Sequence, residues 1–63
     1  MKSYSSRELI KMITNNGWYE TDCEGSHHQY KHPKIKGKIT IPHPRKSFKV
    51  ATQNHILKQA GLK

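Results

Sequence analysis

The spacing of apolar residues predicts a helix near the beginning of the chain. Ser5 and Glu8 fit a capping box, with serine at the N-cap and glutamate three residues later. Gly17 is placed to take the left-handed conformation that ends many helices. We therefore predict a helix over residues 6–16, whose apolar stripe consists of Leu9, Ile10, Met12 and Ile13.

A second helix is predicted at the other end of the chain. Gly61 follows the last helical residue as the C′ glycine, and Leu62 is the apolar residue that often comes next. The pattern leaves open whether this helix begins at Val50 or after Thr52. The residues at helical spacing are Val50, Gln53, Ile56, Leu57 and Ala60.

Three strands are predicted between the helices. Residues 18–23 carry aromatic and β-branched side chains, but their alternation does not show which face is buried. Residues 27–32 end before a proline, and residues 38–41 alternate cleanly between apolar and polar. The turns that separate these strands are Glu24-Gly25-Ser26 and Lys34-Ile35-Lys36-Gly37.

The predicted order α-β-β-β-α defines an α+β fold. Three consecutive strands with short links favour a three-stranded antiparallel sheet. The most economical packing places both helices on one face of this sheet and leaves the other face open to solvent. With 63 residues, the chain has room for a single small domain, which we place over residues 1–63.

Alternation along the middle strand sorts its side chains into two sets. Tyr30 is the apolar member, so we expect it to face the helices together with His28 and His32. Trp18 and Tyr30 are interpreted as core residues rather than as platforms for base stacking. The side chains expected on the open face are those of His27, Gln29, Lys31, Lys38 and Thr40.

Composition adds a strong positive charge to this picture. Twelve Lys and Arg against four Asp and Glu give a formal net charge of +8. Such a charge attracts polyanions, nucleic acid first, although a lysine-rich soluble surface is the plain alternative. No apolar run approaches the ~18 residues of a membrane span, the N-terminus is too polar for a signal peptide, and Cys23 has no disulfide partner. We expect a cytoplasmic protein without a membrane partner.

His27 is the candidate for catalysis. RNA carries its own nucleophile, the 2′-hydroxyl, so a base that takes this proton and cations near the phosphate suffice for cleavage without a metal. Histidine suits the role of base because its unperturbed pKa is about 6.5. The alternative is a surface histidine that only hydrogen-bonds at a turn. The candidate RNA-binding residues are Lys31, Lys38, His43, Arg45 and Lys46.

A zinc site is the rival interpretation of the histidines. Cys23-x₃-His27 and His28-x₃-His32 have spacings that occur in zinc sites. However, four residues along a strand span about 13 Å, which is too far for two ligands of one zinc ion. We therefore predict no metal and no other cofactor. His55 on the last predicted helix is expected to be a solvated residue.

Four segments together resemble the HicA family of mRNA interferase toxins. They follow the order and spacing of that family from about Ser5 to Leu62. The resemblance implies a fold like that of double-stranded-RNA-binding domains, cleavage of mRNA that stops growth, and neutralisation by a HicB-type antitoxin. Operator DNA would be contacted only indirectly, through the antitoxin. The matching segments are Gly17-Trp18, Gly25–Tyr30, Ile41–Pro44 and Ile56–Leu62.

The resemblance also assigns roles to single residues. The catalytic histidine of the family follows Gly-Ser, and this position is His27, after Gly25 and Ser26. Gly25 would shape the turn that presents the histidine. Two departures concern acidic residues and leave the details of the substrate open. Glu24 stands where relatives often have a basic residue, and Glu20 and Asp22 stand where relatives tend to have apolar or basic ones.

The leading hypothesis is therefore the toxin of a type II toxin–antitoxin system, a metal-independent endoribonuclease with His27 as general acid or base. A non-catalytic RNA-binding module of the same fold is the second hypothesis, because such folds bind RNA through backbone and 2′-hydroxyl contacts. Formation of cleaved product distinguishes the two. A purely protein-binding role ranks third, and behaviour that is insensitive to salt would favour it.

Overall fold

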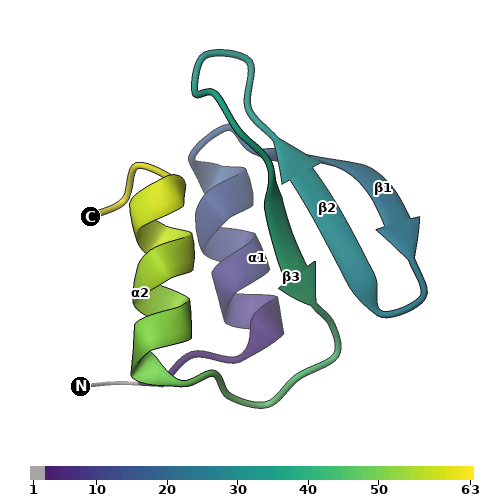
Figure 1. Ribbon diagram of the computed structural model, residues 1–63, viewed down its shortest axis with the longest axis vertical. Coiled ribbons are helices and arrows are strands. Elements are labelled where there is room, and N and C mark those ends of the chain that lie inside the picture. Colours follow the sequence, from purple (N-terminus) through teal and green to yellow (C-terminus); the bar gives the residue numbers. More distant parts are fainter. Residues whose placement is uncertain (1–2) are drawn as a thin grey trace.

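The computed structural model describes residues 3–63 and has the predicted order of elements. The strands form one antiparallel sheet in the order β1-β2-β3, and both helices pack on one face of it (Figure 1). The α+β prediction with two helices on one sheet face is thus confirmed. The elements are α1 (Ser6–Asn15), β1 (Tyr19–Glu24), β2 (His27–Lys31), β3 (Ile39–Pro42) and α2 (Val50–Gln59).

Helix α1 begins at the predicted capping box. The Oγ atom of Ser5 accepts from the backbone N–H of Glu8, and Oε1 of Glu8 accepts from the backbone N–H of Ser5. The helix ends at its C-cap residue Asn16, and Gly17 follows with a φ of +100°. These contacts explain why the pattern of this segment was sufficient to place both ends of the helix within one residue.

Helix α2 begins at Val50, the earlier of the two predicted starts. Its N-cap residue, Lys49, makes no side-chain capping hydrogen bond, so the sequence contains no capping signal at this point. The other end follows the prediction. Gly61 has a φ of +79°, and the N–H of Leu62 donates to the carbonyl of Leu57 at 2.9 Å. This contact closes the helix in the way that C′ glycines commonly do.

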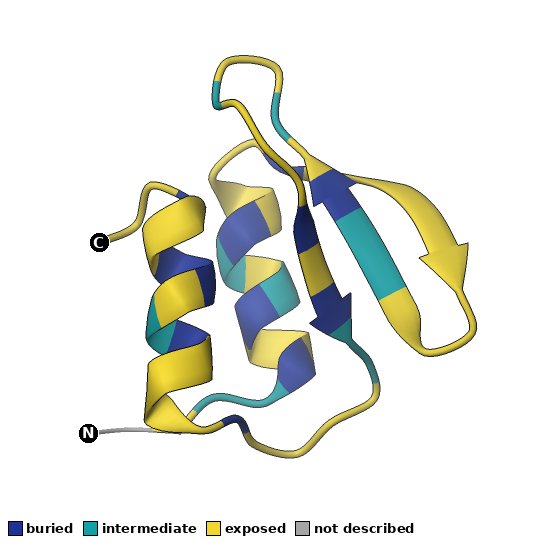
Figure 2. Cartoon of the chain, viewed as in Figure 1, coloured by how far each residue is buried: buried dark blue, intermediate teal, exposed yellow. Residues whose placement is uncertain are grey.

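Strand β1 lies at the edge of the sheet, beyond the cover of the helices (Figures 1 and 2). All six of its residues are exposed, and the pairing with β2 shifts at a bulge around Thr21. Because both faces of this strand meet solvent and the bulge interrupts the alternation, its residues show no buried side. This explains why the sequence could not assign the buried face of the strand.

The hydrophobic core lies between the helices and the inner faces of β2 and β3. Trp18 directly precedes β1 and donates from Nε1 to the carbonyl of Ala60 at 3.2 Å, which ties it to the end of α2. Trp18 and Tyr30 are both core residues, as predicted. Phe48, from the loop before α2, is also buried there, a position that helical or strand spacing does not reveal. The core consists of Leu9, Ile13, Trp18, Tyr30, Ile39, Ile41, Phe48, Ile56, Leu57 and Ala60.

His32 organises the loop between β2 and β3. Its Nε2 donates to the carbonyl of Asn16 at 2.9 Å, and its Nδ1 accepts the backbone N–H groups of Lys34 and Ile35 at 3.0 and 3.1 Å. The ring also packs against Trp18, with the ring centroids 5.3 Å apart. His32 is therefore a structural residue that fixes the loop to the end of α1.

Candidate active site

The outer face of the sheet, which points away from the helices, presents its side chains in rows across the strands. The register pairs His27 with Glu24 on one side and with Pro42 on the other. The next row contains Gln29, flanked by Asp22 and Thr40. Since Tyr30 on β2 is buried against the helices, these alternate positions face solvent, as predicted.

His27 is the first residue of β2, directly after the turn at Gly25 and Ser26. The side chain is exposed and has no hydrogen-bond partner among residues 3–63. Gly25 has a φ of +60°, the left-handed conformation that glycine adopts without strain. The turn therefore presents a free imidazole to solvent, a geometry that suits a proton-transfer group on a large substrate.

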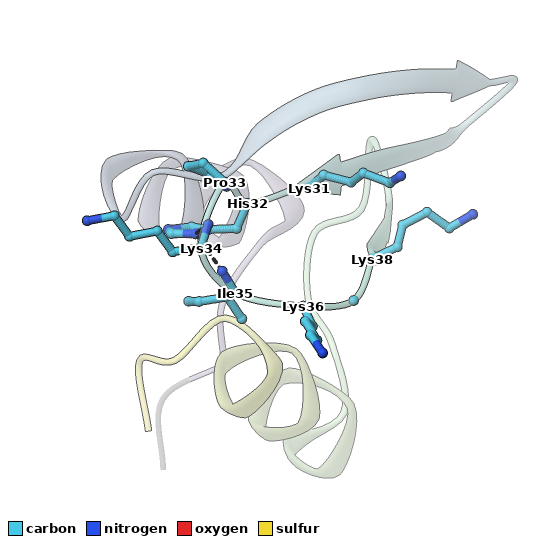
Figure 3. Close-up of a pocket in the computed structure, with 8 residues that line it drawn as sticks. Lys31, His32, Pro33, Lys34, Ile35, Lys36 and Lys38 are labelled. Carbon is cyan, nitrogen blue, oxygen red and sulfur yellow. Dashed lines mark hydrogen bonds between the residues drawn. The ribbon is translucent and has the colours of Figure 1, made fainter.

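Lys31 and Lys38 lie at the other end of the sheet. Lys31 is four residues after His27 on the same strand, which corresponds to about 13 Å. The side chain of Lys31, on β2, and that of Lys38, directly before β3, extend in the same direction (Figure 3). They line an open pocket of about 650 Å³ that is formed by residues 31–38. Lys31 and Lys38 thus do not adjoin His27, and Glu24 is its charged neighbour across the hairpin.

Arg45 and Lys46 are located in the loop that follows β3, at the same end of the sheet as His27. Pro42, the last residue of β3, is the cross-strand partner of His27. The next residue, His43, donates from its backbone N–H to the carbonyl of Ser26 at 2.7 Å. Of the predicted RNA-binding residues, His43, Arg45 and Lys46 therefore lie at the end of the sheet that contains His27.

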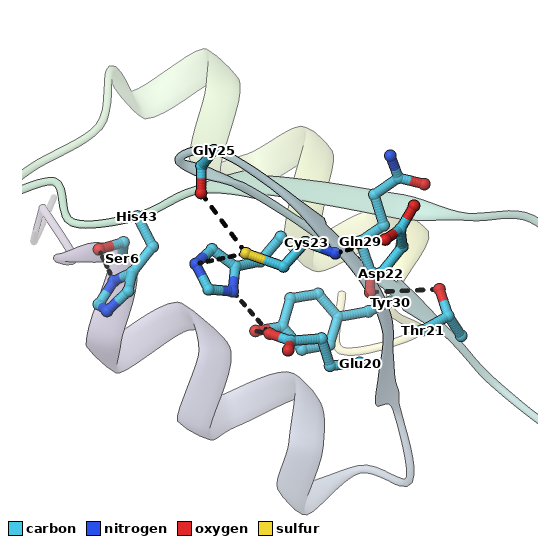
Figure 4. Close-up of polar contacts among 10 residues, drawn as sticks. Ser6, Glu20, Thr21, Asp22, Cys23, Gly25, Gln29, Tyr30 and His43 are labelled. Carbon is cyan, nitrogen blue, oxygen red and sulfur yellow. Dashed lines mark hydrogen bonds and ion pairs between the residues drawn. The ribbon is translucent and has the colours of Figure 1, made fainter.

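His43 connects this loop to helix α1. Its Nδ1 lies 2.6 Å from Oγ of Ser6, which also accepts the backbone N–H of Arg45 at 2.9 Å (Figure 4). The backbone N–H of Ser6 in turn donates to the carbonyl of Arg45 at 2.8 Å. Ser6 is only 1% exposed. Sequence reasoning missed this serine, because a serine in a first helical turn usually faces solvent.

A second polar cluster occupies the inner side of the sheet near β1. His28 donates from Nδ1 to Oε1 of Glu20 at 2.6 Å, and its Nε2 lies 3.6 Å from Sγ of Cys23 (Figure 4). The rings of His28 and His43 make an edge contact with their centroids 5.4 Å apart. His28 thus faces the helix side together with Tyr30, as predicted, and does not share the outer face with His27.

The cluster shifts the pKa values of two of its members. The hydrogen bond from His28 lowers the pKa of Glu20 below its usual value of 4.5. Burial raises the pKa of Tyr30 to about 12, and the nearby charge of Glu20 contributes to this shift. The hydroxyl of Tyr30 donates to Oε1 of Glu20 at 3.3 Å. Glu20 therefore serves as a structural acceptor on the inner side of the sheet.

The structure gives a different reason against a zinc site. Cys23 and His27 lie on two paired strands, so the distance along one strand does not apply to them. They are kept apart by orientation instead, because Cys23 pairs with His28 and His27 pairs with Glu24, in adjacent rows that face opposite sides. Within residues 3–63, no group of three or more His, Cys, Asp and Glu side chains is arranged to hold a metal ion.

His55 is exposed on α2, as expected for a solvated residue.

Neither helix of the described chain has the length and apolar character that crossing a membrane requires.

The fold indicates a class of small toxins through its similarity to a known structure. It is similar to a solved structure described as a toxin–antitoxin complex from Streptococcus pneumoniae, with 32% sequence identity and a TM-score of 0.74. The similarity covers 92% of this chain and 97% of that chain. Among curated proteins, none matches the sequence.

The family follows from the sequence match. Residues 6–62 match the family model of the HicA toxin of bacterial toxin–antitoxin systems. Since the match spans nearly the whole chain, the protein belongs to the HicA toxin family. This confirms the resemblance that the four sequence segments indicated.

Proposed function

We propose that this toxin is a metal-independent endoribonuclease that cleaves mRNA, with His27 as the general base. The observation that carries the proposal is the exposed imidazole of His27, which has no hydrogen-bond partner within residues 3–63, on the open face of a protein with a net charge of +8. Membership of a toxin family supports it. A substrate as large as mRNA requires an accessible site rather than an enclosed pocket, and the outer face of the sheet provides one.

In this mechanism, His27 removes the proton from a ribose 2′-hydroxyl. The resulting oxygen attacks the adjacent phosphorus, and the bond to the 5′-oxygen of the next nucleotide breaks. That oxygen takes a proton from water and leaves as a 5′-hydroxyl. The negative charge that builds up on the phosphate requires nearby cations. Arg45 and Lys46, at the same end of the sheet, are proposed for this role, with His43 as a further contact. Lys31 and Lys38 are proposed to hold the RNA strand farther along, about 13 Å from His27.

Cleavage of RNA in an excess of chelator tests the proposal. The wild-type protein is expected to cut, and His27→Ala is expected to lose about 10²–10⁴-fold in rate, the usual contribution of a general base. His55→Ala is the matched control, because it removes an exposed histidine that lies on α2. Full activity of His27→Ala, or loss of wild-type activity on chelation, would show that the mechanism is wrong. If RNA were bound but remained intact, the protein would be an RNA-binding module instead.

A HicB-type antitoxin is the proposed protein partner, and it is expected to cover the outer face at His27. A solved structure that is similar to this chain is described as a toxin–antitoxin complex. Acidic residues on the antitoxin would speed association with a surface of net charge +8. Binding should raise the melting temperature of the toxin and block RNA cleavage. A complex in which RNA is still cut at the wild-type rate would contradict this account of neutralisation. An mRNA substrate would place the site of action in the cytoplasm.

A further inference from the structure

A second pocket lies at the end of the sheet that contains His27, between the start of α1 and the loop after β3. Its volume is about 500 Å³. The two walls come from segments that are about 40 residues apart in the sequence. The lining residues are Ser5, Ser6, Arg7, His43, Pro44, Arg45 and Lys46.

The walls of this pocket are fixed to each other by hydrogen bonds. Ser6 joins them through its backbone N–H, which donates to the carbonyl of Arg45, and through its Oγ, which accepts from the N–H of Arg45. The same Oγ is 2.6 Å from Nδ1 of His43. Because Ser6 is almost completely buried, these bonds are shielded from water. A ligand would therefore enter a pocket whose backbone is already in place.

The charge of the pocket comes from side chains. Arg7, Arg45 and Lys46 are exposed, and none of them has an ion-pair partner among residues 3–63. The backbone N–H groups of Ser6 and Glu8 at the start of α1 are already used, by the carbonyl of Arg45 and by the N-cap serine. The carboxylate of Glu8 accepts the N–H of that same N-cap residue. Three cations without an acid among the lining residues suit a phosphate group.

The pocket lies at the same end of the sheet as the candidate active site. His27 pairs with Pro42, and the following residue, His43, is both a wall of the pocket and the donor to the carbonyl of Ser26. The ring of His43 lies on the helix side of the sheet, against His28. An RNA strand bound at His27 on the outer face would therefore reach the pocket by passing around the end of the sheet at Pro42. The ring of Pro44 offers an apolar surface for a base or ribose, beside the cations that face the phosphate.

We propose that this pocket binds a nucleotide of the RNA strand that runs past His27, and that Arg7 is one of its phosphate-binding residues. The proposal rests on the proposed RNA substrate and adds to it a binding site and a residue of α1. The alternative occupant is an acidic segment of a protein partner. In that case Arg7→Gln would leave the salt dependence of RNA binding unchanged.

The test measures RNA binding rather than cleavage. The probe is a fluorescently labelled single-stranded RNA with 2′-O-methyl riboses, which lacks the nucleophile and cannot be cut by the wild-type protein. Its affinity is measured by anisotropy over a range of salt concentrations for the wild type, Arg7→Gln and Lys11→Gln. Lys11 is the matched control, because it is an exposed cation one turn farther along α1 and does not line the pocket.

The slope of log affinity against log salt is negative, and we expect Arg7→Gln to reduce its magnitude by about 0.7, the value for one phosphate contact on single-stranded nucleic acid. Adding Lys46→Gln should reduce the magnitude by about 1.4 in total. Lys11→Gln should leave the slope close to that of the wild type. Equal slopes for Arg7→Gln and Lys11→Gln would overturn the proposal. An unchanged RNA slope combined with slower capture by an acidic antitoxin would also overturn it, in favour of a protein docking site.

Failure of the pocket and failure of the proposed cleavage are separate results. If wild type cuts unmodified RNA and His27→Ala does not, while Arg7→Gln binds the probe as the control does, only the pocket is wrong. If Arg7→Gln shows the expected slope but the wild-type protein does not cut RNA, the binding pocket stands and the proposed cleavage is wrong.

Discussion

Any side chain at Gly17 is expected to destabilise the protein, for two reasons. Its φ of +100° is a conformation that L-residues avoid at a cost of about 1–2 kcal/mol. In addition, a Cβ at this position would lie 2.8 Å from Nε2 of His32. The imidazole would have to move, although it holds the loop between β2 and β3 through three hydrogen bonds of about 1 kcal/mol each.

Together, the two contributions predict that Gly17→Ala lowers the free energy of unfolding by about 2–5 kcal/mol. A domain of 63 residues is typically stable by about 3–9 kcal/mol, so this substitution should remove a large share of the stability. Gly37→Ala is the control. Gly37 has a nearly equal φ of +105°, but a Cβ added there would meet nothing within 4 Å. It should lose only the backbone part, about 1–2 kcal/mol.

Urea unfolding measures the difference. The fluorescence of Trp18 and far-ultraviolet circular dichroism should report the same transition, since Trp18 is a core residue. We expect Gly17→Ala to be less stable than Gly37→Ala by about 1–3 kcal/mol, the value of the hydrogen bonds at His32. If the two variants differed by less than about 0.5 kcal/mol, the range of ordinary surface substitutions, His32 would not be the anchor of the loop between β2 and β3.

Three further predictions concern the polar contacts beneath the outer face. Ser6→Ala should destabilise the protein by about 1–3 kcal/mol in urea, because it removes a buried acceptor, whereas the exposed Ser47→Ala should stay within about 0.5 kcal/mol. Glu20→Gln should lower the melting temperature near neutral pH, and this difference should vanish in acid. The reason is that a carboxyl with a lowered pKa stabilises the fold above pH 4.5, its usual pKa, and loses that effect as the pH falls through its pKa in the folded protein. A difference in melting temperature that grew in acid would contradict the contact with His28. In an ultraviolet titration, Tyr30→Phe should remove a step at about pH 12. The stability linked to this raised pKa is present below pH 10 and declines as the pH rises towards 12. A step that persisted in the variant would show that another group causes it.

Local signals in the sequence were sufficient for the framework of the fold. The capping box at Ser5 and Glu8 and the glycines at 17 and 61 mark the ends of helices by contacts within a few residues, and the structure contains these contacts. The alternation around Tyr30 placed His27 on the open face for the same reason, since side chains on a strand have a period of two.

Features that depend on the pairing of distant segments were not predictable. The separation of Lys31 from His27 was available from strand length alone. The position of Arg45 beside the start of α1 was not, because it depends on the hydrogen bonds that Ser6 makes across 39 residues. The roles of Glu20 and Cys23 beside His28 depend on the hairpin register and on a bulge, which alternation does not show. The site was therefore predicted as a face of the sheet, and its arrangement along that face was not.

Analysis of the ends of the cut RNA tests the central claim most directly. If His27 takes the proton of a ribose hydroxyl that then attacks phosphorus, the wild-type products must carry a 2′,3′-cyclic phosphate and a 5′-hydroxyl, and replacing the attacking ribose by deoxyribose must stop the reaction. Products with a 5′-phosphate, or cleavage beside a deoxyribose at an undiminished rate, would mean that water is the nucleophile and that the chemistry proposed for His27 is wrong.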